Sequence, residues 1–179
     1  MARMRLPVVP QNLGAAGTVR LEGMKEYARR LQELGDGMVT RGCVVALAPG
    51  ANILREAARA RAPVLKTPDP RRRPLTLKNA VQALRVKTTR FAATFVVGIR
   101  LLKGSQVAAF KKRTGKAGNE NPDDPFYGTI LEYGKTPRTR RPFLKPAFDA
   151  AAKPAVQTSF EHLKRFTERE IRRIGGTGR

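Results

Sequence analysis

The chain is poor in several residue types on which protein chemistry commonly depends. It contains one cysteine, one histidine and no tryptophan among its 179 residues. The single cysteine, Cys43, excludes an internal disulfide and a metal site built from several cysteines. Its apolar neighbours Val44 and Val45 predict that Cys43 is a buried small hydrophobic residue and not a reactive thiol.

Long apolar runs are also missing. No segment approaches the roughly 20 apolar residues that a helix needs to cross a bilayer. The basic N-terminal segment MARMRLPVVP lacks the apolar stretch of a signal peptide. We therefore expect a protein without a membrane segment that is made and used without secretion.

Recognisable catalytic and cofactor-binding motifs are absent from the sequence. His162 lies in an amphipathic run, FEHLKRF, with no GxSxG or Cys-His motif to accompany it. Glu120, Asp123 and Asp124 are carboxylates, but they fall in a Gly/Asn/Pro loop, and Asp124 has a helix-capping role. The glycines form neither GxxxxGK[ST] nor GxGxxG. The sequence predicts a protein that is not an enzyme and that holds no cofactor or metal.

Acidic residues are scarce, and this is the strongest compositional signal. The chain has 36 Lys and Arg against 14 Asp and Glu, a formal net charge of +22. Such a field repels other copies of the chain unless an anionic partner offsets it. The positive residues concentrate in three clusters: Arg71, Arg72 and Arg73; Lys111, Lys112 and Arg113; Arg138, Arg140 and Arg141. Each cluster is either a solvated loop or a contact to nucleic acid or to an acidic protein surface.

Aromatic residues are few and stand apart from the basic clusters. There are three Tyr and eight Phe, and most of the Phe fall in apolar patterns. Readout of bases or of a single strand depends on aromatic stacking, so this distribution argues against it. A contact to DNA would therefore be to phosphates and indifferent to sequence.

The most informative stretch spans residues 126–147, FYGTILEYGKTPRTRRPFLKPA, which we interpret as a structural joint. Asp124 before Pro125 is a good helix start, because the carboxylate can accept from free backbone N–H groups and proline needs none. A helix is predicted over 126–133. Gly134 is predicted to end it in the left-handed conformation, so that Gly134→Val would harm folding or assembly.

The helix of the joint is predicted to have one apolar face. Tyr127, Ile130 and Tyr133 fall on the same side by helical spacing, whereas Glu132 lies off that stripe in a basic neighbourhood. Residues 135–141 are predicted to form an exposed turn.

The second half of the joint is governed by two prolines. Pro142 and Pro146 flank Phe143 and Leu144, and two prolines four apart do not both fit inside a regular helix. Residues 141–145 are therefore predicted to be extended, with a helix beginning at Pro146. The side chains predicted to pack the joint are Tyr133, Phe143, Leu144 and Pro146.

The first third of the chain predicts an arm followed by helices. Residues 1–16 are basic and contain prolines, which is typical of a flexible N-terminal arm. A short strand over 19–21 and a helix over 24–34 are predicted to follow. A second helix is predicted over 38–62 from apolar residues that recur at steps of three and four. Pro49 within it predicts a kink or a break.

The middle of the chain predicts β structure. Partial alternation over 81–88 and β-branched residues over 91–99 predict antiparallel strands. Residues 106–110 are a further strand candidate, paired with 95–99. Because a polar, glycine-rich stretch follows this candidate, the segment 103–124 is predicted to be a mobile loop insertion.

The last part of the chain predicts one long helix over 146–174, kinked at Pro154, and a disordered tail at 175–179. A single α+β domain is therefore predicted over 17–174, a length that suits one ordinary core. In it, a small antiparallel β-sheet packs against two or three helices, with a flexible N-terminal arm and a long C-terminal helix.

Several segments resemble the signature of a known family. Residues 131–134, LEYG, followed by 141–147, RPFLKPA, are similar to the "E-aromatic-G … RPFL-x-PA" signature of the neck or tail-completion proteins of long-tailed phages, the group of lambda's tail protein Z. Residues 19–34 resemble the family's strand, glycine and first helix, and 60–63, ARAP, resembles the end of its long helix. Family members usually continue with Thr-Gly-x-Leu, whereas residues 64–74 here form a longer loop rich in proline and arginine.

The resemblance implies a structural virion protein of the phage neck or proximal tail end, acting in tail completion or head–tail joining. It implies a homo-oligomeric, hexameric ring between the head connector and the tail tube, next to connector, tail terminator or tail tube proteins. It also implies assembly in the cytoplasm of the bacterial host and non-specific contact with DNA phosphates inside the ring. The alternative, supported by net charge alone, is a sequence-independent basic nucleic-acid-binding protein.

Overall fold

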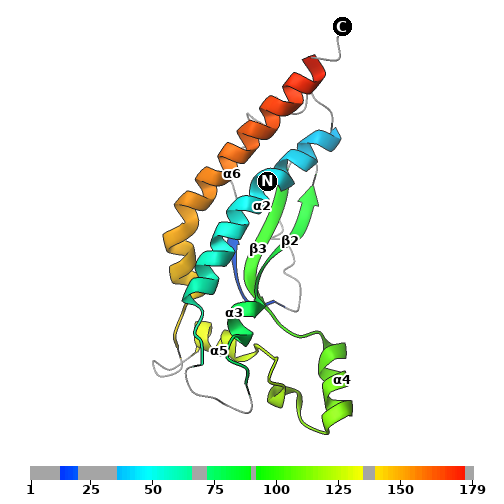
Figure 1. Ribbon diagram of the computed structural model, residues 1–179, viewed down its shortest axis with the longest axis vertical. Helices are drawn as coiled ribbons and strands as arrows, with labels where there is room; N and C mark the ends of the chain where they lie inside the picture. Colours follow the sequence, from blue (N-terminus) through cyan, green and yellow to red (C-terminus); the bar gives the residue numbers. More distant parts are fainter. Residues whose placement is uncertain (1–12, 20–35, 66–71, 90–91, 135–139, 176–179) are drawn as a thin grey trace, which may run out of the picture.

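The computed structural model describes residues 13–19, 36–65, 72–89, 92–134 and 140–175 (Figure 1). These residues form an α+β fold in which an antiparallel sheet packs on helices and the last helix is long, as the sequence predicts. The elements follow in the order β1 (Leu13–Val19), α2 (Asp36–Arg61), α3 (Thr76–Ala80), β2 (Val81–Thr89), β3 (Ala92–Arg100), α4 (Gly104–Thr114), the 3-10 turn η1 (Gly118–Glu120), α5 (Tyr127–Tyr133) and α6 (Leu144–Gly175).

The sheet has three strands in the order β1-β3-β2, and both neighbours of β3 run antiparallel to it. The two strands predicted over 81–88 and 91–99 are confirmed as β2 and β3. Residue 19 of the strand predicted over 19–21 is the last residue of β1, and residues 20–21 lie outside the described residues. Strand β1 begins at residue 13 and so includes the end of the predicted arm. The Gly- and Ala-rich sequence of β1, LGAAGTV, carries no alternating apolar signal that would mark a strand. Residues 1–12 of the arm and the helix predicted over 24–34 lie outside the described residues.

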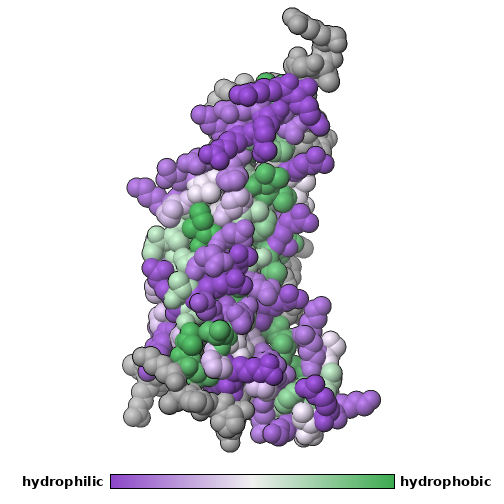
Figure 2. Space-filling view, in the orientation of Figure 1, coloured by the Kyte–Doolittle hydropathy of each residue, from purple (hydrophilic) through white to green (hydrophobic). Residues whose placement is uncertain are grey.

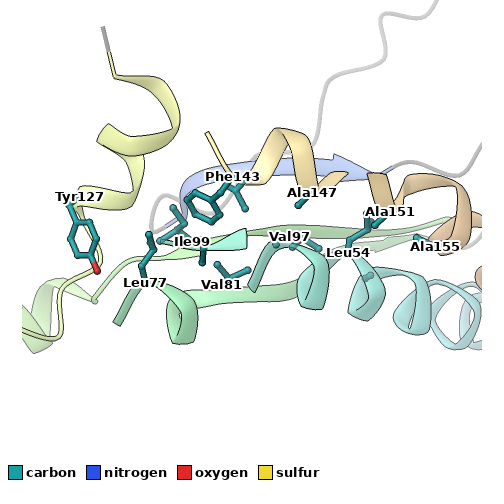
Figure 3. Close-up of a cluster of buried hydrophobic side chains, with 14 residues drawn as sticks. Leu54, Leu77, Val81, Val97, Ile99, Tyr127, Phe143, Ala147, Ala151 and Ala155 are labelled. Carbon is teal, nitrogen blue, oxygen red and sulfur yellow. The ribbon is translucent and has the colours of Figure 1, made fainter. Parts of the chain in front are cut away.

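Helices α2 and α6 lie side by side and antiparallel along one face of the sheet (Figure 1). Small residues make their close contact possible. On α2, Ala51 and Ala58 are buried beside Leu54, and α6 carries buried alanines at similar spacing: Ala147, Ala151 and Ala155. Figure 3 shows these alanines following one another along α6 above Leu54 and Val97. The core therefore lies between the two helices and the sheet.

Neither long helix is interrupted at its internal proline. Of the kink or break predicted at Pro49, the break is wrong, because α2 continues through it, and α6 likewise continues through Pro154. The kinks predicted at these two prolines stay predictions. Pro154 is exposed, so water can bind the carbonyl group that the missing proline N–H leaves free. Around Pro49, α2 packs along α6, and most helical stability in proteins comes from tertiary packing of this kind.

The segment 103–124 is not the predicted loop, since it contains α4 and η1. The strand candidate over 106–110 is also wrong, because these residues lie inside α4. The Gln106 Oε1 atom accepts the Lys103 backbone N–H at 2.9 Å, and Gly115, with φ 70°, ends the helix. Both are helix-end signals, and they outweigh the short apolar run between them. The mobility of this segment stays a prediction.

Candidate functional site

The joint between α5 and α6 is built around one buried carboxylate. The Glu132 side chain belongs to a residue that is 5% exposed. Its Oε2 atom accepts the backbone N–H groups of Phe143 at 2.9 Å and Leu144 at 3.0 Å, and its Oε1 atom accepts that of Lys145 at 3.0 Å. Because the free N–H groups of a helix N-terminus carry partial positive charge, they suit an anionic acceptor. Glu132 of α5 therefore caps α6.

The remaining first-turn position of α6 needs no partner. Pro146 has no N–H, and the Ala147 N–H donates to the Phe143 carbonyl at 3.2 Å. Helix α6 consequently begins at Leu144, two residues before the predicted start. The extended conformation predicted for 141–145 is therefore wrong for Leu144 and Lys145, which lie in the helix. Pro146 occupies the first turn, where an intrahelical N–H bond is not required, so it does not disturb the helix. Pro142 precedes the helix.

The start of α5 agrees with the prediction to within one residue, since the helix begins at Tyr127 and not at 126. The Asp124 Oδ1 atom accepts the Phe126 N–H at 3.1 Å, and the Pro125 carbonyl accepts the Gly128 N–H at 2.9 Å. Burial raises the pKa of the Asp124 carboxyl, and the hydrogen bond from Phe126 lowers it by less. Asp124 and Pro125 thus set the start of α5, as expected from the sequence.

The predicted end of α5 is wrong in its conformation. Gly134 has φ −52° and ψ 140°, a backbone conformation that any residue can adopt. Gly134→Val is therefore no longer expected to harm folding through backbone strain. Instead, the chain after α5 is held by the Arg141 N–H, which donates to the Leu131 carbonyl at 2.8 Å. This bond, and not a left-handed glycine, ties the residues before α6 to α5. Of the exposed turn predicted over 135–141, residues 135–139 lie outside the described residues.

The packing of the joint agrees with the prediction only in part. Phe143 and Leu144 are buried as predicted, and Phe143 lies over Ile99 in the core (Figure 3). Tyr133 is 60% exposed and Pro146 is exposed, so neither packs the joint. Seven residues of helix are too few for periodicity to identify the buried face.

The apolar face predicted for α5 is also wrong. Ile130 is 49% exposed, whereas Tyr127, Gly128 and Glu132 are the buried residues of this helix. The hydrogen bonds that Glu132 accepts from the N-terminus of α6 hold its side of α5 inward. The sequence contained one signal for this role, because Glu132 is the only acidic residue in the basic segment 126–147.

The first basic cluster is tied to the joint. The Arg72 guanidinium carbon lies 4.4 Å from the ring centroid of Tyr127 and 5.8 Å from that of Phe126. The two rings meet edge to face, with centroids 6.1 Å apart. Arg72 therefore makes cation–π contacts and is not simply a solvated charge. Arg73 pairs with Asp123 at 3.2 Å, and Arg71 lies outside the described residues.

The other clusters are exposed where the structure describes them. Lys111, Lys112 and Arg113 form the last turn of α4, and this helix stands apart from the α2–α6 layer (Figure 1). In Figure 2, it belongs to a lobe of mainly hydrophilic residues at the lower right. Arg140 and Arg141 are exposed before α6, and Arg138 lies outside the described residues. Among the described members of the clusters, those of α4 lie apart from those beside the joint (Figure 1).

Sequence reasoning did not find an open groove between α3, the adjoining ends of β2 and β3, and α4. Its volume is about 910 Å³. Basic side chains line it, namely Arg73, Arg100 and Lys103, and Asp123 is its one acidic lining residue. No motif marks this groove in the sequence, because its walls come from segments up to about 50 positions apart.

The described residues were predicted to hold neither a metal site nor a reactive thiol, and their geometry bears on both. Across the described ranges, no three His, Cys, Asp or Glu side chains come together as a metal site would require. Cys43 is 1% exposed, which confirms the predicted burial, and this burial raises the pKa of its thiol. The thiol therefore stays protonated and inert near neutral pH. Within the same ranges, no helix is both long and apolar enough to span a membrane.

One pH effect follows from Tyr127. Burial raises the pKa of its phenol above the ordinary 10.0, although the Arg72 charge and a hydrogen bond from the Leu77 N–H act to lower it. The unfolded chain therefore loses this proton more readily than the folded chain. Stability from Tyr127 is fully present below about pH 10 and is lost as the pH rises through the folded-state pKa.

We expect Tyr127→Phe to reduce the loss of stability between about pH 8 and pH 11. Urea unfolding at both pH values measures this difference. The lost hydrogen bond to Leu77 lowers stability equally at both, so only the change between them is informative. An unaltered alkaline loss in the variant would contradict the assignment.

Comparison with known proteins adds no relative, since neither a protein-family model, nor a curated protein, nor a solved structure matches the chain.

Proposed function

We propose that the chain is a structural virion protein of a long-tailed phage, a ring-forming part of the neck or proximal tail end that acts in tail completion or head–tail joining. The observation that carries the proposal is the Glu132 cap. The two halves of the family signature are 131–134 and 141–147, and the Glu132 hydrogen bonds to Phe143, Leu144 and Lys145 join them into one unit. The residues on which the resemblance rests therefore have a shared physical role.

This architecture suits a protein that works by contact. The joint fixes the direction of α6 relative to α5, while Ile130 and Tyr133 remain exposed beside it. A ring uses heterologous contacts, in which one surface of a subunit meets a different surface of the next. The net charge of +22 then requires acidic neighbours or DNA phosphates close to the ring.

A sequence-independent nucleic-acid-binding protein is the second candidate. The observation that favours it is the exposed basic end of α4, formed by Lys111, Lys112 and Arg113. Phosphate binding through such residues needs no defined pocket and weakens steeply with salt.

Light scattering coupled to size exclusion distinguishes the two candidates. We expect a ring of about six times the chain mass of 19.7 kDa, either for the protein alone or after addition of purified tail tubes. Duplex DNA binding is measured in parallel at several salt concentrations. A protein that stays monomeric with tail tubes, and whose DNA affinity falls steeply with salt, would overturn the ring proposal and favour the second candidate.

A further inference from the structure

The open groove beside α4 carries more positive charge than its own residues neutralise. Arg73 has an acidic partner at 3.2 Å, Asp123, which also lines the groove. Arg100 instead donates from Nη1 to the neutral Gln82 Oε1 at 3.2 Å. Lys103 lines the groove beside it. Because the one carboxylate among the described residues that line the groove already pairs with Arg73, none of these residues neutralises Arg100 or Lys103, and their charges are available to a ligand.

The groove also offers apolar surface and amide groups. Leu75 at its wall is 48% exposed, and Leu101 and Leu102 line it further along. Asn79 adds a side-chain amide that can donate to or accept from a peptide backbone. The Gln106 Oε1 atom already accepts the Lys103 N–H, but its amide nitrogen can still donate. Apolar contact combined with a few polar groups is typical of a peptide-binding groove.

Helix α4 lacks the contacts that would normally stabilise it. It has 11 residues, and none of them is buried. A helix of this length is marginal in water unless tertiary packing supports it. Val107 touches the η1 turn at Gly118, and Ser105 and Gln106 of the first turn of α4 line the open groove. A ligand in the groove would add packing that this helix lacks.

The lining distinguishes protein from nucleic acid as the occupant. Single-stranded nucleic acid binds through a basic channel together with aromatic stacking platforms. None of the groove's lining residues is aromatic, while several are leucine or proline. Carboxylates spaced by apolar side chains match this mixture better than a continuous phosphate backbone does.

We propose that the groove between α3 and α4 binds an extended acidic segment of a neighbouring protein, with carboxylates at Arg100 and Lys103 and apolar side chains against Leu75. This rests on the proposed function, in which acidic neighbours surround the ring, and it identifies the partner chemistry. The groove belongs to a single chain, so binding can be measured whether or not a ring forms.

The probe is a fluorescein-labelled peptide of about ten residues, roughly 33 Å when extended, in which Glu alternates with Leu and Ser. Binding to the full chain is measured by fluorescence anisotropy at physiological salt, which screens distant charges. We expect the double variant Arg100→Glu, Lys103→Glu to weaken binding by about tenfold or more. The matched control, Lys111→Glu with Lys112→Glu, changes net charge equally outside the groove and should change affinity by less than about twofold.

Two further measurements test whether the peptide binds in the groove. Hydrogen exchange should slow in α4 when the peptide is bound, and the neutral variant Arg100→Gln, Lys103→Gln should bind weakly even if the charge reversal disturbs folding. Equal loss in the groove and control variants, or no peptide binding by the unaltered chain, would overturn the proposal. An oligothymidylate of the same charge serves as the competing ligand. If it bound more tightly than the peptide and the groove variant abolished that binding, the occupant would be nucleic acid and the proposal would be overturned. Light scattering on the same samples reports the ring separately, so either idea can fail without the other.

Discussion

Glu132→Ala is expected to lower the free energy of unfolding by about 3 to 5 kcal/mol. The change leaves the backbone N–H groups of Phe143, Leu144 and Lys145 without the acceptor that lies 2.9 to 3.0 Å away. Two of these bonds are buried, so water cannot readily replace the carboxylate. The loss is a large share of the roughly 5 to 15 kcal/mol that stabilises an ordinary domain. Urea unfolding followed by circular dichroism measures it.

Two companion variants separate the cap from general effects. Glu132→Gln keeps one side-chain oxygen but points an amide NH₂ at a backbone donor, so we expect an intermediate loss of about 1 to 3 kcal/mol. Glu161→Ala removes an exposed carboxylate from α6 and should change stability by about 0.5 kcal/mol or less. If Glu132→Ala unfolded at the same urea concentration as Glu161→Ala, the cap would contribute nothing and the main support for the proposed function would be lost.

Gly50→Val is the second large effect, with an expected loss of about 3 kcal/mol. A Cβ atom at Gly50 would lie 2.5 Å from the Ala155 carbonyl oxygen and against the Ser159 Oγ atom. The carbonyl belongs to the backbone of α6 and cannot rotate away, so α2 and α6 must separate along their shared core. Thermal unfolding of the purified variant gives the size of the effect.

Gly50→Ala is a sharper test of this contact, because the expected change in its free energy of unfolding has the opposite sign to the usual one. In an exposed helix, replacing Gly by Ala usually stabilises by about 0.5 to 1 kcal/mol. We expect Gly50→Ala to destabilise instead, because even one methyl group meets the α6 backbone. The control is Gly104→Ala in α4, where nothing lies within 4 Å of the added Cβ and stability should hold or rise slightly. A Gly50→Ala variant more stable than the unaltered chain would show that the two helices are not in close contact there.

Long periodic segments were the most predictable part of the fold. The helix predicted over 38–62 is α2 within two residues at each end, and the two predicted strands are β2 and β3. In these elements the same residues set both the local conformation and the buried face. The apolar steps along α2, for example, lead to buried Leu54 and Ala58.

Short elements were predictable only in part. The five residues of α3, which contain the fully buried Leu77, carry too little pattern to be recognised. The sequence of residues 106–110 is compatible with either a strand or a helix. The hydrogen bond from the Lys103 N–H to Gln106, which marks a helix start, distinguishes the two. Gly134 matches a helix-ending signal, but it has a backbone conformation open to any residue, and the Arg141 N–H donates back to the Leu131 carbonyl.

The candidate site also has a part that the sequence predicted and a part that only the structure showed. The sequence alone determined that residues 126–147 contain a short helix and the start of a second helix, because prolines and a capping Asp act within a few residues of their own position. Only the tertiary structure decided that this joint depends on Glu132, and that the chain carries a basic groove beside α4. A carboxylate meets N–H groups 11 to 13 positions away only after the chain has turned back on itself. That return path depends on which surfaces pack together, and no local pattern of residues records it.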